Sequence, residues 1–373
     1  MTPDSTPRPA PVVATVLDLL AGSPGGSVEL FLDLYTGPRP LIPARAFMLQ
    51  PAGPRPDGPA GLELLSVGGK ALDEPDFTAY VHRLRRALAV ALDPDQVAVV
   101  HLQHLTFGAT PALIRALPHH PRIALVHGTD LLFAAAHRTQ LRVLRNTTAA
   151  ADAIVVPTAA MADHLRELAP ALDTTKVAEI PWGIPDHLIT TPPPRPPRDP
   201  DGVLRLLYAG RLTAEKGVQT LLRTLTGTTG AELSIAAPAH EFSGLAPLLR
   251  TAAVPVRYLG WLDRQELWRA FADHDALLMP STTLEAMGLV ALEAQACGLP
   301  VMFQPVPGLN QSLGAAGLPT DFTDPTALAA AVQRLRTDST VLDDLRAAGL
   351  ANAARFPLSA TATALAHLGR TLT

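Results

Sequence analysis

Two glutamates eight positions apart, Glu285 and Glu293, are the first candidates for chemistry, in the segment TTLEAMGLVALEAQACGLP. Glu285 is expected in a loop and Glu293 in the second turn of the helix that follows. The start of this helix, around Gly288 and Leu289, offers unpaired backbone N–H groups and a positive dipole end, which suit a phosphate. Carboxylates beside such a site suit sugar hydroxyls. The alternative is two solvated glutamates, but the helix is almost entirely small or apolar, so burial is expected.

Two cations, Arg211 and Lys216, follow a predicted strand in the segment LLYAGRLTAEKGVQTLL. Arginine offers a planar fork and lysine a mobile point charge, so the pair suits a diphosphate. The alternative is an ordinary surface helix start. Lys70, Lys176 and Lys216 are the three lysines among 30 basic residues, so a lysine at a chosen place is rare and the diphosphate interpretation gains weight.

Other candidates follow apolar runs of the first half. His127 precedes Gly128 and Thr129, where a neutral imidazole can hydrogen-bond a hydroxyl or a phosphate; the alternative is a structural histidine. Asp130 is expected either to bind a cationic acceptor or to cap a helix. The pair Gly25 and Gly26 would let the backbone approach a nucleotide diphosphate closely.

Neither a metal nor a disulfide is expected. Three aspartate pairs are interpreted as turns or as the approach to a strand, namely Asp93-Pro94-Asp95, Asp199-Pro200-Asp201 and Asp273-His274-Asp275. A single cysteine, Cys297, excludes an intramolecular disulfide and a multi-cysteine metal site, as expected of a reducing compartment.

Short apolar runs alternate with amphipathic stretches, which predicts an α/β protein with mainly parallel sheet. Strands are expected at Val12–Leu17, Ala98–Leu102, Ile123–Val126, Ala153–Val156, Leu204–Ala209, Ala276–Met279 and Val301–Phe303. Ligands bind off the carboxyl ends of such strands, so the loops after the runs at 98–102, 123–126 and 153–156 should share one crevice edge. Helices are expected at Asp263–His274, with a capping box to Glu266, at Gly288–Ala296 and at Ser359–Leu372.

The chain is long enough for two domains, at 373 residues. The proline-rich stretch Thr190–Pro200 predicts a semi-rigid linker, placed at 187–202. A net charge of −4 gives no surplus for binding nucleic acid. The run Val12–Leu20 is too short and too polar for a signal peptide or membrane span, so a cytoplasmic protein without membrane insertion is expected.

Four segments together resemble the family 4 retaining glycosyltransferases of the GT-B fold: LVHGTD, AGRLTAEKG, YLGWLDRQEL and PSTTLEAMGLVALEAQACGLPV. The order and spacing match across residues 12 to 356. This resemblance implies two Rossmann-like domains with mainly parallel sheets facing across a cleft. The implied domains are an acceptor-binding domain at 1–186 and a nucleotide-sugar-binding domain at 203–356, with a last helix at 357–373 packing back on the first.

The resemblance also implies roles for individual residues. Arg211 and Lys216 would bind the diphosphate and Glu293 the ribose hydroxyls. Glu285 would bind the donor sugar beside the backbone of Met287, Gly288 and Leu289, His127 would lie at the anomeric centre, and Leu262 would hold the base through its backbone. Departures from the family pattern are Ala286 for glycine, Ala237-Pro238-Ala239 for a glycine-rich turn, and Trp182 for asparagine.

The first domain also resembles glycosyltransferases of aminoglycoside antibiotic biosynthesis, through LLAGSPGGSVELFLDLYTGP and HLQHLTFGATPAL. This implies an aminocyclitol or pseudodisaccharide acceptor, such as 2-deoxystreptamine or paromamine, attracted by Asp18, Asp33 and Asp130. Acceptor contacts are expected from Asp18, Gln103, His104 and Asp130. HGTD resembles the enzyme that glycosylates malate in bacillithiol synthesis, but few cations are available for a dicarboxylate.

The expected reaction is a metal-independent, retaining transfer of a hexose, amino sugar or pentose from a UDP-sugar to a small acceptor's hydroxyl. His127, Arg211, Lys216 and Glu285 are the expected catalytic residues, and Gly25 and Gly26 are added to the donor site. The donor is a substrate, and no cofactor is expected. Alternatives are a nucleotide-sugar epimerase, a phosphorylase of the same architecture, or a non-enzymatic sugar-binding protein. The oligomeric state is left open.

Overall fold

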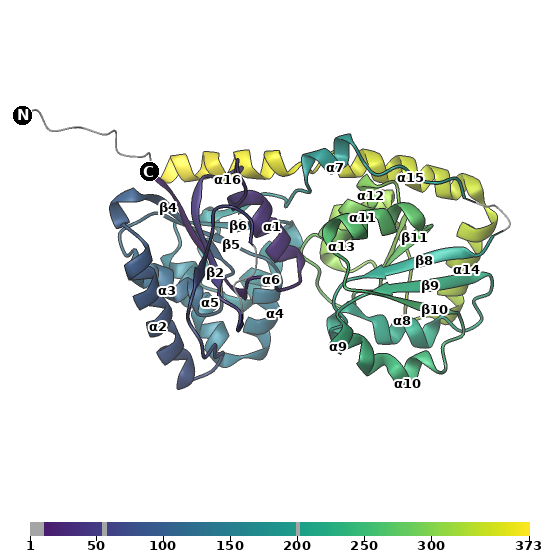
Figure 1. Ribbon diagram of the computed structural model, residues 1–373, viewed down its shortest axis with the longest axis horizontal. Helices are drawn as coiled ribbons and strands as arrows, with labels where there is room; N and C mark the ends of the chain where they lie inside the picture. The colour runs from purple at the N-terminus through teal and green to yellow at the C-terminus, as the bar shows by residue number, and fades with distance from the viewer. Residues whose placement is uncertain (1–10, 54–57, 199–201) are drawn as a thin grey trace, which may run out of the picture. The chain divides into compact units, whose positions relative to one another are not determined.

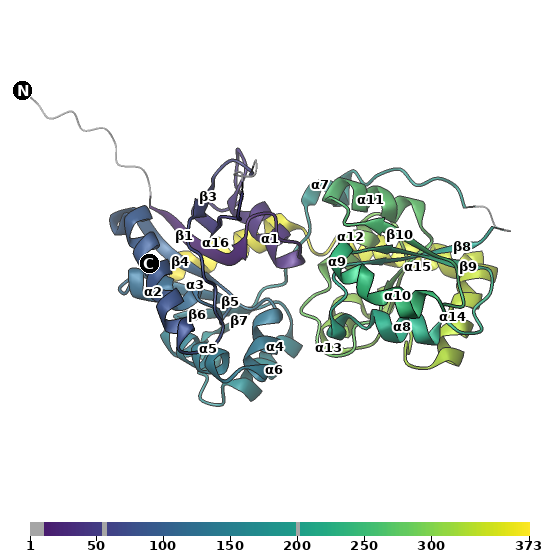
Figure 2. The same cartoon turned by 60° about the horizontal axis from the view of Figure 1, so that its bottom comes forward.

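The chain folds into two compact units, as seen in a computed structural model that describes residues 11–53, 58–198 and 202–373. Unit 1 comprises Met1–Ile180 and Ala362–Thr373, and unit 2 comprises Pro181–Thr361. Each unit is built on a parallel sheet with helices on both faces (Figures 1 and 2).

Within its described residues, unit 1 has a seven-stranded sheet in the order β3-β2-β1-β4-β5-β6-β7. The strands are β1 Val12–Leu20, β2 Ala44–Leu49, β3 Leu62–Leu65, β4 Val97–Gln103, β5 Arg122–Leu125, β6 Ala153–Val156 and β7 Val177–Glu179. The α-helices are α1 Gly26–Tyr35, α2 Asp76–Ala91, α3 Ala109–Ala116, α4 Thr129–Ala136, α5 Arg138–Ala150 and α6 Ala159–Leu168.

The predicted strands of the first half are confirmed, and so is their common edge. β4, β5 and β6 are neighbours and pair in parallel, with His101 beside Ile123 and Ala124 beside Ile154. Since all three run in one direction, the loops that leave their carboxyl ends start from the same edge of the sheet.

The described residues of unit 2 form a six-stranded sheet in the order β10-β9-β8-β11-β12-β13. The strands are β8 Leu204–Ala209, β9 Ala231–Ala236, β10 Val256–Gly260, β11 Ala276–Met279, β12 Val301–Phe303 and β13 Leu318–Pro319. The α-helices are α7 Asp186–Thr190, α8 Val218–Thr224, α9 Ala239–Phe242, α10 Ala246–Leu249, α11 Arg264–Asp273, α12 Leu289–Ala296, α13 Pro307–Leu313, α14 Pro325–Thr337 and α15 Ser339–Ala353. Figure 1 shows α8 and α10 on one side of β8, β9 and β10, and α11 and α12 on the other.

Local signals place the elements around the candidate site as predicted. β8, β11 and β12 have the predicted bounds. The capping box of α11 is confirmed, because Asp263 accepts from the Glu266 N–H at 2.8 Å and Glu266 accepts from the Asp263 N–H at 2.9 Å. Gly298, in the left-handed region at φ 67°, follows the end of α12.

The first unit ends at Ile180, before the predicted boundary at 186. The segment after it is fixed within unit 2, because the Gly183 N–H donates to Thr361 at 2.9 Å and Ile184 pairs with Pro357. A Cβ at position 183 would lie 2.6 Å from the Pro357 carbonyl oxygen, so glycine is required for this close approach.

The predicted linker at 187–202 begins inside α7, and its described part is attached to unit 2. The Arg195 guanidinium donates to the carbonyl oxygens of Phe271 and His274, both at 2.6 Å. Arg198 lies 3.7 Å from the buried carboxylate of Asp275. The proline-rich segment is therefore packed on unit 2 through its arginines.

The last helix, α16 (Leu358–Leu372), is continuous across the division between the units. Its residues from Ala362 onward group with unit 1, and Ala362 and Leu365 are buried. The helix approaches the sheet of unit 1 closely, since a Cβ at Gly369 would lie 3.7 Å from Val99. Unit 1 is therefore built from two segments that are far apart in the sequence.

Candidate active site

Two loops at the carboxyl edge of the unit 2 sheet are joined to each other. They follow β8 and β11, which pair in parallel. The Thr282 N–H donates to the Glu215 carbonyl at 2.9 Å. Gly217 is at φ 70°, and a Cβ there would lie 1.9 Å from the Pro280 carbonyl oxygen, so this position requires glycine on two grounds. The Lys216 turn, Ala214–Lys216, is thereby held against the loop that carries Glu285.

Lys216 and Glu285 form an ion pair in the structure. The Lys216 Nζ lies 2.6 Å from Glu285 Oε2, and the Ser281 hydroxyl donates to the same oxygen at 3.1 Å. Both side chains are largely buried, so the pair is only partly screened by water. Lys216 and Glu285 were predicted to bind different parts of one donor, and the structure brings the two side chains together. Arg211 lies in the same loop, half-buried, and its carbonyl accepts from the Tyr208 hydroxyl.

The start of α12 is shaped by two glycines. Gly288 caps the helix at φ 69°, next to buried Met287 and ahead of Leu289, the first helical residue. A Cβ on Gly308 would lie 1.5 Å from the Glu285 carbonyl oxygen. Gly308, which the sequence analysis did not single out, therefore lets α13 approach the Glu285 loop.

Glu293 is buried, which excludes the interpretation as a solvated helix glutamate. It is 7% exposed, and each carboxylate oxygen has one donor: Arg264 on Oε1 at 2.5 Å and the Trp268 indole N–H on Oε2 at 3.1 Å. The Arg264 guanidinium also lies over the Trp268 ring at 5.3 Å. Leu262, half-buried, lies between β10 and α11.

Arg264 and Trp268 were missed by sequence reasoning. Their signal is the i, i+4 spacing on the predicted helix 263–274, which places both side chains on one face. That spacing does not reveal which buried acid the face meets.

In unit 1, His127 is half-buried and belongs to a polar cluster at the ends of β4 and β5. Its Nε2 lies 3.0 Å from the Gln103 amide oxygen, and its backbone N–H donates to Asp130 at 3.2 Å. The His104 ring is 4.6 Å from the His127 ring. Burial, aided by His104, lowers the pKa of His127 well below 6.5, so the imidazole is neutral near neutral pH.

The four residues predicted to contact the acceptor are all buried: Asp18, Gln103, His104 and Asp130. Asp18 accepts from the Tyr80 hydroxyl at 2.5 Å and the Gly108 N–H at 2.7 Å, at the start of α3. Asp130 accepts from the Leu105 N–H at 3.0 Å, and burial raises its pKa to about 6. The carboxylate oxygens of Asp18 and Asp130 accept from backbone and side-chain groups of unit 1, and contact between these four residues and an acceptor stays a prediction.

The glycine pair lies at the start of α1. Gly25 caps the helix at φ 143°, Gly26 is its first residue, and nothing lies within 4 Å of a Cβ built on Gly25. The backbone is therefore open to close approach at this point, and its contact with a donor stays a prediction.

The aspartate pairs behave as structural groups wherever they are described. Asp93 caps the turn Pro94–Gln96, and Asp275 is buried with Arg205 at 3.2 Å. The pair at 199 and 201 lies outside the described residues. Within the described part of the chain, no group of three or more His, Cys, Asp or Glu side chains is placed to hold a metal ion, and no helix is long and apolar enough to cross a membrane.

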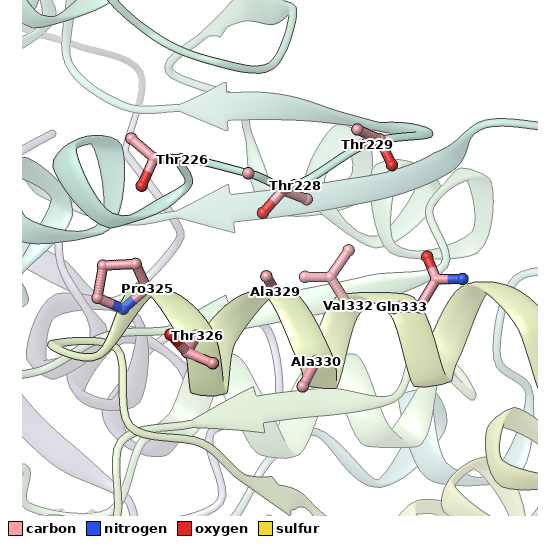
Figure 3. A pocket seen from close by; sticks show the side chains of 10 residues that line it. Thr226, Thr228, Thr229, Pro325, Thr326, Ala329, Ala330, Val332 and Gln333 are labelled. Carbon is pink, nitrogen blue, oxygen red and sulfur yellow. The ribbon is translucent and has the colours of Figure 1, made fainter.

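A hollow of about 490 Å³ in unit 2 contains none of the predicted site residues. It lies between the turn after α8 and the side of α14, lined by residues such as Thr228 and Gln333 (Figure 3). That turn leads into the amino end of β9, whereas the Lys216 and Glu285 loops leave the carboxyl ends of β8 and β11. The hollow is therefore separate from the candidate site.

Two family models match the chain, one in each half. "Glycosyltransferase Family 4" matches residues 47–188, and "Glycosyl transferases group 1" matches residues 204–338. A D-inositol 3-phosphate glycosyltransferase of Stackebrandtia nassauensis is 30% identical, over 91% of this chain and 81% of that protein. This chain belongs to glycosyltransferase family 4. It is a glycosyltransferase by family, and Lys216, Glu285 and Glu293 lie in its group 1 half.

Other relatives of this family 4 glycosyltransferase match different shares of the chain. A glycogen synthase of Mycobacterium tuberculosis is 33% identical over 66% of this chain, and the match spans 63% of that enzyme. A sucrose-phosphate synthase structure from Thermosynechococcus elongatus has a TM-score of 0.79 at 20% identity, covering 98% of this chain and 99% of that one. Anabaena HepE with UDP-glucose has a TM-score of 0.75 at 16% identity, covering 97% of this chain and 100% of that one. These likenesses show the fold, which is the GT-B fold with two Rossmann-like units.

Proposed function

We propose that this family 4 glycosyltransferase moves a glycosyl group from a UDP-sugar to a hydroxyl of a small acceptor, with retention of configuration and without a metal. The observation that carries the proposal is the Lys216–Glu285 pair at the carboxyl edge of the unit 2 sheet, beside the start of α12. A cation, an acid and a helix amino terminus gathered there suit a diphosphate linked to a sugar.

The ion pair also suggests how the donor is received. A diphosphate offers Lys216 more negative charge than one carboxylate does, so donor binding would draw the ammonium away from Glu285. Glu285 would then accept from the hydroxyls of the donor sugar, steadied by Ser281. The HepE structure with UDP-glucose, a chain of the same fold, supports a donor of this class.

The proposed chemical step follows from these charges. The bond from the anomeric carbon to the diphosphate oxygen breaks, and a bond to the acceptor oxygen forms on the same face. Arg211, Lys216 and the N–H groups at the start of α12 stabilise the leaving diphosphate, which takes the acceptor's proton. Glu293, held by Arg264 and Trp268, would accept from the ribose hydroxyls, Leu262 would contact the base, and Gly25 and Gly26 would face the diphosphate.

For the acceptor, we propose a cyclitol ring. The relative named D-inositol 3-phosphate glycosyltransferase favours a cyclitol phosphate. The aminocyclitol or pseudodisaccharide of the sequence analysis shares the ring but carries amines. Its attraction was argued from Asp18, Asp33 and Asp130, two of which are buried with partners inside unit 1. We therefore propose a cyclitol phosphate as the first candidate acceptor and an aminocyclitol as the second.

The test pairs UDP-glucose, UDP-N-acetylglucosamine and UDP-xylose with inositol phosphates, 2-deoxystreptamine, paromamine and maltooligosaccharides, and detects products by mass spectrometry. Lys216→Ala and Arg211→Ala are each expected to lower turnover by roughly 10²-fold or more, because each removes a charge that stabilises the leaving group. Lys176→Ala is the matched control, since Lys176 donates to the Ala151 carbonyl in unit 1.

Full activity in both site variants would show that the assigned site is wrong. Conversion of a UDP-sugar with no acceptor present would indicate an epimerase. UDP binding by calorimetry, with no product on any acceptor, would indicate a binding protein.

A further inference from the structure

A chain of hydrogen bonds behind His127 runs in one direction through unit 1. It starts at the imidazole Nε2, passes through the Gln103 amide and the Thr15 hydroxyl, and ends at the His101 carbonyl. The three distances are 3.0 Å, 3.0 Å and 2.9 Å. Thr15 and Gln103 are buried, so water does not compete with these bonds.

The direction of the chain is set at its far end. A backbone carbonyl oxygen only accepts hydrogen bonds, so the Thr15 hydroxyl must donate its single proton to the His101 oxygen. Thr15 Oγ1 is then an acceptor towards Gln103, which must present its NH₂ group. This fixes which end of the Gln103 amide carries the oxygen.

The amide oxygen of Gln103 therefore faces His127 Nε2, and an oxygen without a proton needs a donor. Because the pKa of His127 is lowered by burial, the ring carries one proton at neutral pH. That proton lies on Nε2, so Nδ1 is left with a lone pair.

We infer that Gln103 and Thr15 are positioning residues that hold His127 as the Nε2–H tautomer, so that Nδ1 acts only as a hydrogen-bond acceptor. A group that hydrogen-bonds Nδ1 must donate: a sugar or acceptor hydroxyl fits, and a deprotonated phosphate oxygen does not. The inference rests on the proposed function for its substrate, and it removes one of the two ligands that His127 was predicted to take.

The test is ¹⁵N nuclear magnetic resonance at neutral pH, on the full chain with ¹⁵N-labelled histidine. The His127 signals are those that disappear in the His127→Gln variant. The expected spectrum shows a protonated Nε2 and an unprotonated Nδ1. Thr15→Val keeps the shape but removes the hydroxyl, so the amide can turn and both tautomers are expected. Thr15→Ser restores the hydroxyl and is expected to restore the single tautomer.

Activity provides a second readout. Thr15→Val is expected to lower kcat about tenfold, the worth of one oriented hydrogen bond, and Thr15→Ser to recover it. Thr148→Val is the matched control, because Thr148 is a buried threonine of unit 1 whose hydroxyl donates to the Arg145 carbonyl.

A proton on Nδ1 in the unchanged chain would overturn the inference while leaving the proposed function intact. So would a single Nε2–H tautomer that persists in Thr15→Val, because the anchor would then be irrelevant. Absence of any transfer activity would instead count against the proposed function, since the tautomer is observed without a substrate. Should Thr15→Val fail to fold, Gln103→Leu tests the same link one step nearer to His127.

Discussion

The two carboxylates proposed to bind the donor are each paired with a cation inside unit 2. Glu285 is paired with Lys216, and Glu293 with Arg264. A buried carboxylate with a single donor on each oxygen keeps acceptor capacity for further hydroxyls. The side chains of unit 2 therefore hold both carboxylates in place.

The Glu293 arrangement yields a prediction for α11. Arg264→Gln removes the charge that holds Glu293 Oε1, so the carboxylate should lose its fixed orientation towards the ribose. The KM for the UDP-sugar is expected to rise about tenfold, with a smaller change in kcat, because the ribose is remote from the reacting bond.

Steady-state kinetics on the donor check this outcome, and thermal unfolding separates it from a loss of folding. Arg269→Gln is the matched control, because Arg269 is an exposed arginine on the same helix. An unchanged donor KM in Arg264→Gln would mean that Glu293 does not contact the donor.

Contacts between single residues could be predicted from the sequence only where the two residues are a few positions apart. The capping box links Asp263 to Glu266, three positions away, and was found from the sequence. The bond from Lys216 to Glu285 spans 69 positions, and that from Arg264 to Glu293 spans 29. These pairings depend on which strands become neighbours, which local residue patterns do not encode.

The strands predicted from the sequence are mainly buried apolar runs, whereas strands with little burial, such as β3, β7 and β10, were not predicted. β6, β8, β11 and β12 have the predicted bounds. Helix α7, which overlaps the predicted linker from residue 187 to residue 190, was missed because prolines dominate the composition that follows it. The contacts between loops were missed too, since they involve backbone atoms and glycines whose neighbours are distant in sequence.

The contact between the loops after β8 and β11 gives a prediction that compares two glycines, Gly217 and Gly227. Gly217→Ala adds a Cβ at a left-handed φ and drives it against the Pro280 oxygen, so the turn must move and Lys216 with it. Gly227→Ala meets the same backbone strain at φ 76°, with nothing within 4 Å of the new atom. Alanine at a left-handed glycine costs roughly 1–2 kcal/mol, which is the expected effect of Gly227→Ala.

Gly217→Ala is expected to cost more than that and to lower transfer activity at least tenfold, whereas Gly227→Ala should leave activity unchanged. Chemical denaturation and the transfer assay measure the two effects. Equal losses of stability in the two variants would show that the contact with Pro280 is unimportant.

For the molecule as a whole, buried histidines couple folding to pH. Burial lowers the pKa of His101 and His104 to about 3, and that of His127 well below 6.5. The unfolded chain binds these protons as pH falls below about 6.5 and the folded chain does not, so stability is lost on acidification. Asp130 acts in the opposite sense, because its raised pKa makes the folded chain take up one proton between the unfolded value and about 6.

The free energy of unfolding should therefore decrease as the pH is lowered from about 7 to about 5. Denaturant titration at each pH measures this free energy. His104→Asn should reduce that slope by roughly one proton, because it removes one buried base. Asparagine also tolerates the positive φ of 79° at this position. His119→Asn is the control for loss of an exposed histidine. An identical slope in His104→Asn and the unchanged chain would contradict the assignment.

The continuity of α16 has a consequence for synthesis on the ribosome. Unit 1 is built from residues up to Ile180 together with Ala362–Thr373, so its apolar surface for α16 stays uncovered while the whole of unit 2 is made. A nascent chain cannot complete unit 1 until residues 362–373 emerge, although amino-terminal domains generally fold first during synthesis. Unit 2, whose residues are contiguous, is therefore the part that can finish folding first.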